Sequence, residues 1–176
     1  MRRLPILLAG AAAACAAPAI AAALSVAKSS VVVSDPLLGA LRPRVIPGAE
    51  VDYSLTVTNP LANLLSPVRQ VSIGDTIPDS LKLRVTDLAR AGSGPVEFTD
   101  GDLLGLGLSG SGLAYRYVAL GDGTDGLDFH DGKNWGYVPV PDANGFDPKV
   151  RGLRVTLSGT HATGGSFRLR YRVVVR

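Results

Sequence analysis

The sequence predicts an all-β protein: a cleaved signal peptide followed by an Ig-like antiparallel β-sandwich of about seven to nine strands. Three observations carry this prediction. Beyond the first 23 residues, apolar and polar side chains alternate in short runs. Turn-forming residues separate these runs, and most of the 21 Gly and 12 Pro fall there. No segment carries the sustained apolar stripe of a helix.

Residues 1–23 are predicted to be a signal peptide that is cut before Leu24. Two arginines follow Met1, an apolar and Ala-rich run comes next, and residues 21–23 give the small-x-small pattern of a cleavage site. Two alternatives stay open: an uncleaved membrane anchor, and lipidation at Cys15. An anchor wants about 20 strongly apolar residues, whereas Pro5 and Pro18 interrupt this run.

The mature chain, residues 24–176, is expected to be one domain. It has 153 residues, enough for a core of its own. Its 16 basic and 15 acidic residues leave a net charge of +1, and it contains no Cys. We therefore expect no disulfide, no nucleic-acid partner and no transmembrane segment in the mature form. Export predicts a secreted protein, in the periplasm or at the cell surface.

The first strands are expected at residues 31–33 and 50–58. The first is a short apolar run that the turn residues 34–36 close. A turn at Pro47 and Gly48 precedes the second, which is the clearest strand of the chain. It alternates four apolar with polar side chains, as a half-buried strand does, and Asn59 and the proline after it end it.

The later strands are predicted in the same way, from apolar and polar side chains that alternate between turn residues. The segment 101–112 is rich in Gly and Leu, which indicates either a bulged strand or a packed loop. The segment 167–175 alternates as clearly as the strand at 50–58. The remaining strands are expected at 66–73, 81–85, 96–98, 113–120 and 150–157.

Two spaced motifs occur in order: IPGAEVDYSLTVTN at residues 46–59 and DTIPDSL at residues 75–81. Over about residues 46–85 the chain resembles the bacterial surface repeat called domain of unknown function 11. A Gly-rich turn before 167–175 matches the usual ending of that repeat loosely. The resemblance implies an Ig-like sandwich of secreted and surface proteins, normally in tandem, whereas this chain has room for one copy.

The motif residues also have a physical interpretation as scaffold. Gly48 can take the positive φ that a tight turn needs. Tyr53 falls on the apolar, inward face of its strand, and Asn59 is expected to bond to nearby turn backbone. None of these roles involves chemistry on a ligand.

Residues 121–132 form the most polar segment, with Asp122, Asp125, Asp128 and Asp131 at every third position. Aspartates in a Gly-rich loop suit Ca²⁺, although the spacing differs from that of an EF-hand. The alternative is a solvated loop without metal, since Asp-Gly pairs are common in turns. His130 beside these aspartates raises the remote alternative of a hydrolase, but no nucleophile sits in a recognisable motif.

Trp135 and Tyr137 form a second cluster, among prolines. Exposed, the pair could bind sugar faces or extended peptides, which would make the protein a carbohydrate- or ligand-binding module. The favoured alternative is that Trp135 is the one large side chain that fills the core of the sandwich, because Trp is highly buried on average.

The residues therefore predict an exported, non-catalytic structural or adhesive module of the bacterial cell envelope or extracellular space. Its partners would be copies of itself or other envelope proteins, with glycans as a further class. A specific form is self-assembly by strand addition, in which the N-terminal segment 24–36 is exchangeable and Val31, Val32 and Val33 complete a neighbour's sheet. Arg168, Arg170 and the following alternate arginine of the last strand either dock on anionic surfaces or protect the strand from aggregation.

Overall fold

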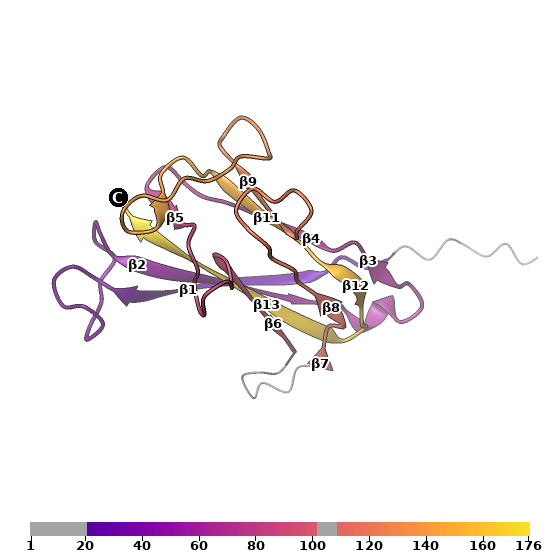
Figure 1. Ribbon diagram of the computed structural model, residues 1–176. Coiled ribbons are helices and arrows are strands. Elements are labelled where there is room, and N and C mark those ends of the chain that lie inside the picture. Colours follow the sequence, from indigo (N-terminus) through magenta and orange to yellow (C-terminus); the bar gives the residue numbers. More distant parts are fainter. Residues whose placement is uncertain (1–20, 102–108) are drawn as a thin grey trace, which may run out of the picture.

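The computed structural model describes residues 21–101 and 109–176. Residues 1–20, most of the predicted signal peptide, and 102–108, part of the Gly/Leu-rich segment, lie outside the described residues. The described chain is all-β, as expected, with sheets packed face to face and one 3-10 turn, Leu61–Asn63 (Figure 1). It holds no helix long and apolar enough to cross a membrane.

The first layer is one sheet in the order β1-β2-β13-β5-β10, with β6 and β7 also beside β13. The central strand is β13, which pairs with β2 from Ser166 opposite Thr58 to Val174 opposite Glu50. All pairings are antiparallel except that of β7 with β13. The strands are β1 (Ser25–Ser34), β2 (Glu50–Thr58), β5 (Leu81–Arg84), β6 (Val96–Asp100), β7 (Ser109–Gly110), β10 (Phe146–Asp147) and β13 (Gly165–Val175).

The second layer consists of two short three-stranded sheets, β4-β11-β9 and β3-β12-β8. They follow one another along the chain, because only Leu157 separates β11 from β12. Between β3 and β4, Gln70 takes a φ of 53°, which breaks the strand expected at 66–73 into two. The strands are β3 (Val68–Arg69), β4 (Ser72–Thr76), β8 (Leu113–Ala114), β9 (Leu127–His130), β11 (Gly152–Thr156) and β12 (Ser158–His161).

The hydrophobic core lies between the two layers. The alternation expected at 50–58 and 167–175 is confirmed, since alternate side chains of β2 and β13 join the core. Tyr53 packs on it from β2, on the inward face as expected. The largest fully buried side chains include those of Tyr171, Phe167 and Leu83.

Other expectations need correction. In the strand expected at 113–120, only the first two residues pair in a ladder, while Tyr115 and Tyr117 pack against the core without regular strand structure. Strand β1 is longer than the segment 31–33. Strands β9, β10 and β12 were not expected, because their sequences are short and rich in Gly, Asp or Ser.

Candidate functional site

Strand β9 runs through the segment that was expected to be an Asp-rich loop. Leu127 and Phe129 are buried in the core, and they alternate with Asp128 and His130, which point to the outer face of the second layer. The period-2 signal is therefore present in the sequence. The many Asp and Gly residues around it conceal the strand.

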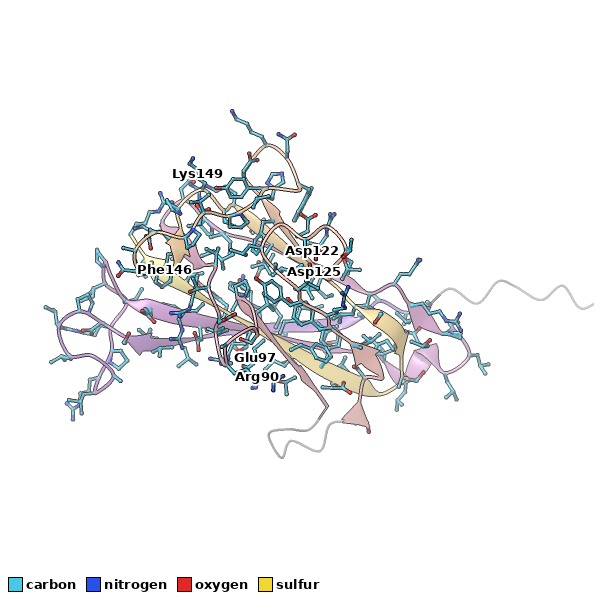
Figure 2. All side chains as sticks on the ribbon, in the orientation of Figure 1. Arg90, Glu97, Asp122, Asp125, Phe146 and Lys149 are labelled. Atoms are coloured by element: carbon cyan, nitrogen blue, oxygen red, sulfur yellow. The ribbon has the colours of Figure 1, made fainter. Side chains whose placement is uncertain are left out.

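The first two aspartates of the series stabilise the chain ahead of β9. Asp122 accepts hydrogen bonds from the hydroxyl of Thr124 at 2.7 Å and from its backbone N–H at 2.8 Å. These two bonds hold the pKa of Asp122 below its usual range. Asp125 accepts from the backbone N–H of Leu127 at 2.9 Å and of Val118 at 3.0 Å. Figure 2 shows Asp122 and Asp125 near each other in this loop.

The other two aspartates are also engaged. Asp128 forms an ion pair with Arg154 at 2.5 Å and accepts from the backbone N–H of Gly136 at 2.9 Å. Asp131 accepts from the backbone N–H groups of Asn134 and Lys133, both at 2.7 Å, and these bonds lower its pKa. Within residues 21–101 and 109–176, no three His, Cys, Asp or Glu side chains gather as metal ligands would. A Ca²⁺ site at this segment stays a prediction.

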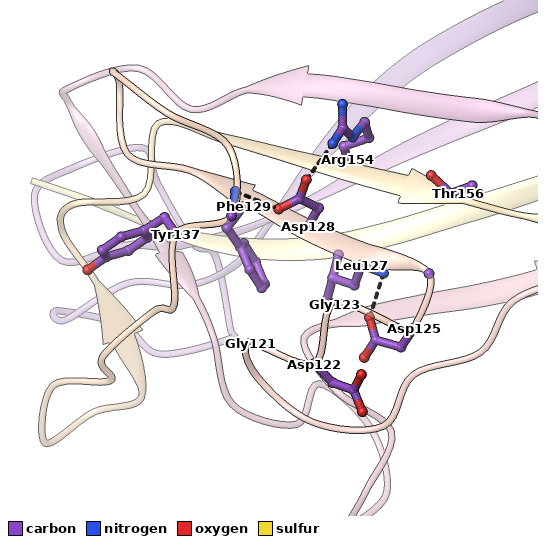
Figure 3. A pocket seen from close by; sticks show the side chains of 12 residues that line it. Gly121, Asp122, Gly123, Asp125, Leu127, Asp128, Phe129, Tyr137, Arg154 and Thr156 are labelled. Atoms are coloured by element: carbon purple, nitrogen blue, oxygen red, sulfur yellow. Dashed lines mark hydrogen bonds and ion pairs between the residues drawn. The ribbon is translucent and has the colours of Figure 1, made fainter.

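A hollow of about 340 Å³ lies beside β9 and β11 (Figure 3). Asp122, Asp125 and Asp128 line it together with Tyr137 and Arg154. Three of the four predicted metal ligands thus border one hollow, and Asp131 does not line it.

Tyr137 is a partly buried structural residue. Its hydroxyl donates to Asp147 Oδ2 at 2.9 Å, and the same oxygen accepts from the backbone N–H of Val140 at 2.7 Å. Burial and the hydrogen bond to Asp147 raise the pKa of Tyr137 to about 12. Tyr137 therefore fixes the loop that follows β9.

Trp135 does not fill the core, which corrects the favoured interpretation of this residue as a buried core side chain. Its side chain is 44% exposed. The residue bridges His130, whose side chain faces outward, so Trp135 lies on the outer face of the second layer. The His130 ring lies 5.0 Å from the Trp135 ring, and the Arg154 guanidinium lies 4.3 Å from the ring centre. The core is filled instead by smaller aromatic and aliphatic side chains.

A second hollow, of about 370 Å³, borders Trp135. Its floor is backbone, because Gly74 on β4 and Gly152 on β11 carry no side chain there. A Cβ on Gly152 would lie 3.8 Å from the Trp135 ring. Seven residues line this hollow: Gly74, Asp75, Thr76, His130, Trp135, Arg151 and Gly152.

The aspartates near His130 do not orient it. Gly132 N–H donates to His130 Nδ1 at 2.9 Å, whereas Asp131 caps a backbone turn and Asp128 pairs with Arg154. The hydrolase alternative thus has no carboxylate–histidine pair among the described residues. The support for this alternative was the aspartates beside His130, and both of them bond elsewhere.

Two of the three arginines of β13, Arg170 and Arg172, are compensated by acids on neighbouring strands. Arg170 pairs with Asp52 at 2.6 Å and with Glu97 at 2.7 Å, and Arg172 pairs with Asp52 at 2.6 Å and Glu50 at 3.1 Å. Burial alone would raise the pKa of Asp52, but the two arginines outweigh it and lower that pKa. These two arginines are therefore engaged within the sheet.

A polar cluster ties β1 to the second layer. The ammonium of Lys28 lies 2.6 Å from Asp75 on β4 and 4.7 Å from the centre of the Tyr53 ring. Tyr171 stacks on Tyr53 at 5.6 Å and donates its hydroxyl proton to Asp75 at 2.5 Å. Lys28 and Tyr171 thus link the two motif residues Tyr53 and Asp75 between the layers.

Comparison with known proteins yields no relative: no protein-family model, no curated protein and no solved structure matches this chain.

Proposed function

We propose that this protein is an exported, non-catalytic structural module of the bacterial cell envelope or extracellular space, which assembles with further copies of itself through β1. The predicted signal peptide, residues 1–23, supports export. The position of β1 carries the proposal of assembly. This strand is ten residues long, pairs with β2 along one edge, and has no partner strand along its other edge among the described residues.

The free edge of β1 presents little that would repel an incoming strand. Proteins protect exposed edges with charges, prolines or short strands, and β1 contains no proline. Its one charged residue, Lys28, is already neutralised by Asp75. On the outer face the strand presents Ser25, Ala27 and Ser29, which are small, uncharged and exposed. A second strand could therefore add through backbone hydrogen bonds.

The register of β1 favours addition beside the strand over exchange of the segment 24–36. Val31 and Val32 face Asp52 and Val51 of the chain's own β2, and an irregularity between Val32 and Ser34 takes Val33 out of the regular register. Nine register pairs join β1 to β2. Exchange would have to break all of them, whereas edge addition breaks none.

The all-β fold with its antiparallel sheets and the resemblance to domain of unknown function 11 support a scaffold role. Gly48 takes a φ of +86° at the turn before β2. Asn59 is 1% exposed and donates to the carbonyl of His161 at 2.8 Å, far along the chain, in place of the local turn bond that was expected. Residues of the motif thus hold the sandwich together.

Sedimentation velocity of the mature protein over a concentration series tests the proposal. We expect oligomers that Ser29→Lys weakens by roughly tenfold or more in dissociation constant, because like charges then meet at the paired edge. The matched control is Ser72→Lys, an exposed position on β4, the edge strand of the other layer. Wild-type protein that stays monomeric, or equal effects of both variants, would contradict assembly through β1.

A further inference from the structure

We propose that the hollow beside Trp135 is a binding site for a neutral saccharide of one or two sugar units. It lies on the outer face of β4 and β11, in the other layer from β1. Its volume of about 370 Å³ falls within the range of small-molecule sites. The proposal is independent of assembly, since none of the residues lining the hollow belongs to β1.

Trp135 is the apolar element of the site. Its indole is 44% exposed, although it is held in place. The Arg154 guanidinium lies 4.3 Å from the ring centre and is itself fixed by Asp128 at 2.5 Å. A fixed, exposed aromatic ring suits the C–H face of a sugar, because it offers a large apolar surface at little cost in side-chain entropy.

The floor of the site leaves room for a ring to lie flat. A methyl group added at Gly74 would fit without a clash, since its nearest neighbour would be the carbonyl oxygen of Leu153 at 3.7 Å. At Gly152 a methyl group would lie 3.4 Å from His130 Cβ and 3.8 Å from the Trp135 ring. Larger side chains at these two positions would fill the space beside the indole.

The remaining walls provide hydrogen-bonding groups. Thr76 contributes an exposed hydroxyl, and Arg151 contributes a guanidinium. Because Gly132 N–H donates to His130 Nδ1, the neutral imidazole carries its proton on Nε2. Sugar hydroxyls both donate and accept, so they can pair with each of these groups.

The charges around the hollow favour a neutral ligand. Arg151 pairs with Asp79 at 2.5 Å, and Arg154 pairs with Asp128 at the same distance. The carboxylate of Asp75 is held by Lys28. An acidic sugar would therefore meet no uncompensated cation here. An apolar peptide would find one apolar side chain, that of Trp135, among the lining residues.

Isothermal titration calorimetry of the mature protein with cellotetraose, maltotetraose, chitotetraose and mannotetraose tests the proposal. We expect saturable binding of at least one of these probes, with a matching change in the fluorescence of the one Trp in the chain. Trp135→Ala should weaken binding at least tenfold. Gly74→Val should do the same while it leaves the indole in place as a fluorescent reporter.

The matched control for the blocking variant is Ser72→Val, which adds a similar side chain to the same face of β4 outside the hollow. This variant should bind as the wild type does. No saturable heat with any probe up to 10 mM (roughly the weakest affinity worth assigning to a site) would overturn the proposal. So would equal affinity in Gly74→Val and the wild type. Ser29→Lys should change assembly and leave saccharide binding intact, which separates the two proposals.

Discussion

Tyr171 connects the two layers through a single hydroxyl group. The side chain is 1% exposed, and its hydroxyl donates to Asp75 at 2.5 Å. Burial and the neighbouring carboxylate raise the pKa of Tyr171 far above the ordinary value, so the hydroxyl keeps its proton throughout the physiological range. It therefore acts as a permanent donor to Asp75.

Removing that hydroxyl should destabilise the fold. We expect Tyr171→Phe to lower the free energy of unfolding by about 1.5–3 kcal/mol, the range for a hydrogen bond to a charged group. Urea denaturation measures this difference. Tyr53→Phe keeps the stacked ring pair and serves as the control, with a change within about 0.5 kcal/mol. Equal losses in the two variants would rule out the bond to Asp75 as the cause.

His161 makes the stability depend on pH. It is 1% exposed, its Nε2 lies 3.1 Å from the carbonyl oxygen of Gly165, and its Nδ1 has no partner among the described residues. Burial lowers the pKa of His161, although Gly165 and the charge of Asp100 oppose the shift. The folded protein therefore binds a proton here less readily than the unfolded chain does.

The sign of the effect follows from this difference. Above the unfolded value of about 6.5 both states are neutral at this residue. As the pH falls below that value the unfolded chain takes up the proton first, so stability declines until the folded pKa is reached. Urea denaturation between pH 7.5 and 5.5 (roughly one unit either side of the unfolded pKa) should show this loss. His161→Phe should flatten the profile, and an unchanged slope in that variant would refute the assignment.

At the scale of elements, strands whose alternation is long and unbroken could be predicted from the sequence. Strands β2 and β13 lie in the same layer, and every second side chain of each is buried in the core. The alternation of apolar and polar residues in their sequences is therefore strong. Strand β9 could not be predicted, because its four residues offer only Leu127 and Phe129 within an Asp-rich segment. The segment 113–120 has strand-like composition, but after Ala114 the ladder ends and burial comes from loop packing.

The candidate site could also be predicted only in part from the sequence. Composition identified Trp135 and the aspartates as notable residues. It could not reveal that Trp135 lies outward, since this depends on its bridge to His130 and on the space that Gly74 and Gly152 leave. These glycines are far from Trp135 in sequence, and no local pattern connects them.

The segment that leads into β1 bears on the place where the proposed signal peptide would be cut, which the sequence puts before Leu24. Asn63 is 1% exposed, and it accepts from the backbone N–H of Ala22 at 2.6 Å and donates to its carbonyl oxygen at 2.9 Å. A cut before Leu24 would remove Ala22 and leave a buried amide without these partners, which is unfavourable. A cut before Ala22 keeps the bonds, and Ala19, Ile20 and Ala21 also give a small-x-small pattern.

For a protein exported as proposed, we therefore expect a chain that begins at Ala22 in place of Leu24, as intact mass and N-terminal sequencing would reveal. Asn63→Ala should destabilise that form and serves as the test of the contact. A mature chain that begins at Leu24, with Asn63→Ala leaving its stability unchanged, would contradict this expectation.

At the scale of the whole molecule, charged side chains of opposite sign are paired between strands and between layers. Arg170 and Arg172 on β13 are paired across the sheet, and Lys28 is paired between the layers. Because Lys28 is the one charged residue of β1, the long free edge of this strand carries no unpaired charge. This arrangement is the physical basis for assembly, because an uncharged, unpaired edge favours addition of another strand.

Intermolecular distances at β1 test assembly most directly. Residues 24–176 contain no Cys, so in that chain Ser29→Cys can carry a single nitroxide label for pulsed dipolar spectroscopy. Adjacent strands lie about 4.8 Å apart, so label pairs should lie within about 20 Å once the label arms are included. A label at Thr156→Cys, on the outer face of the other layer, should give longer distances. A decay at Ser29→Cys with no intermolecular distance, at concentrations at which sedimentation velocity shows oligomers, would contradict assembly through β1.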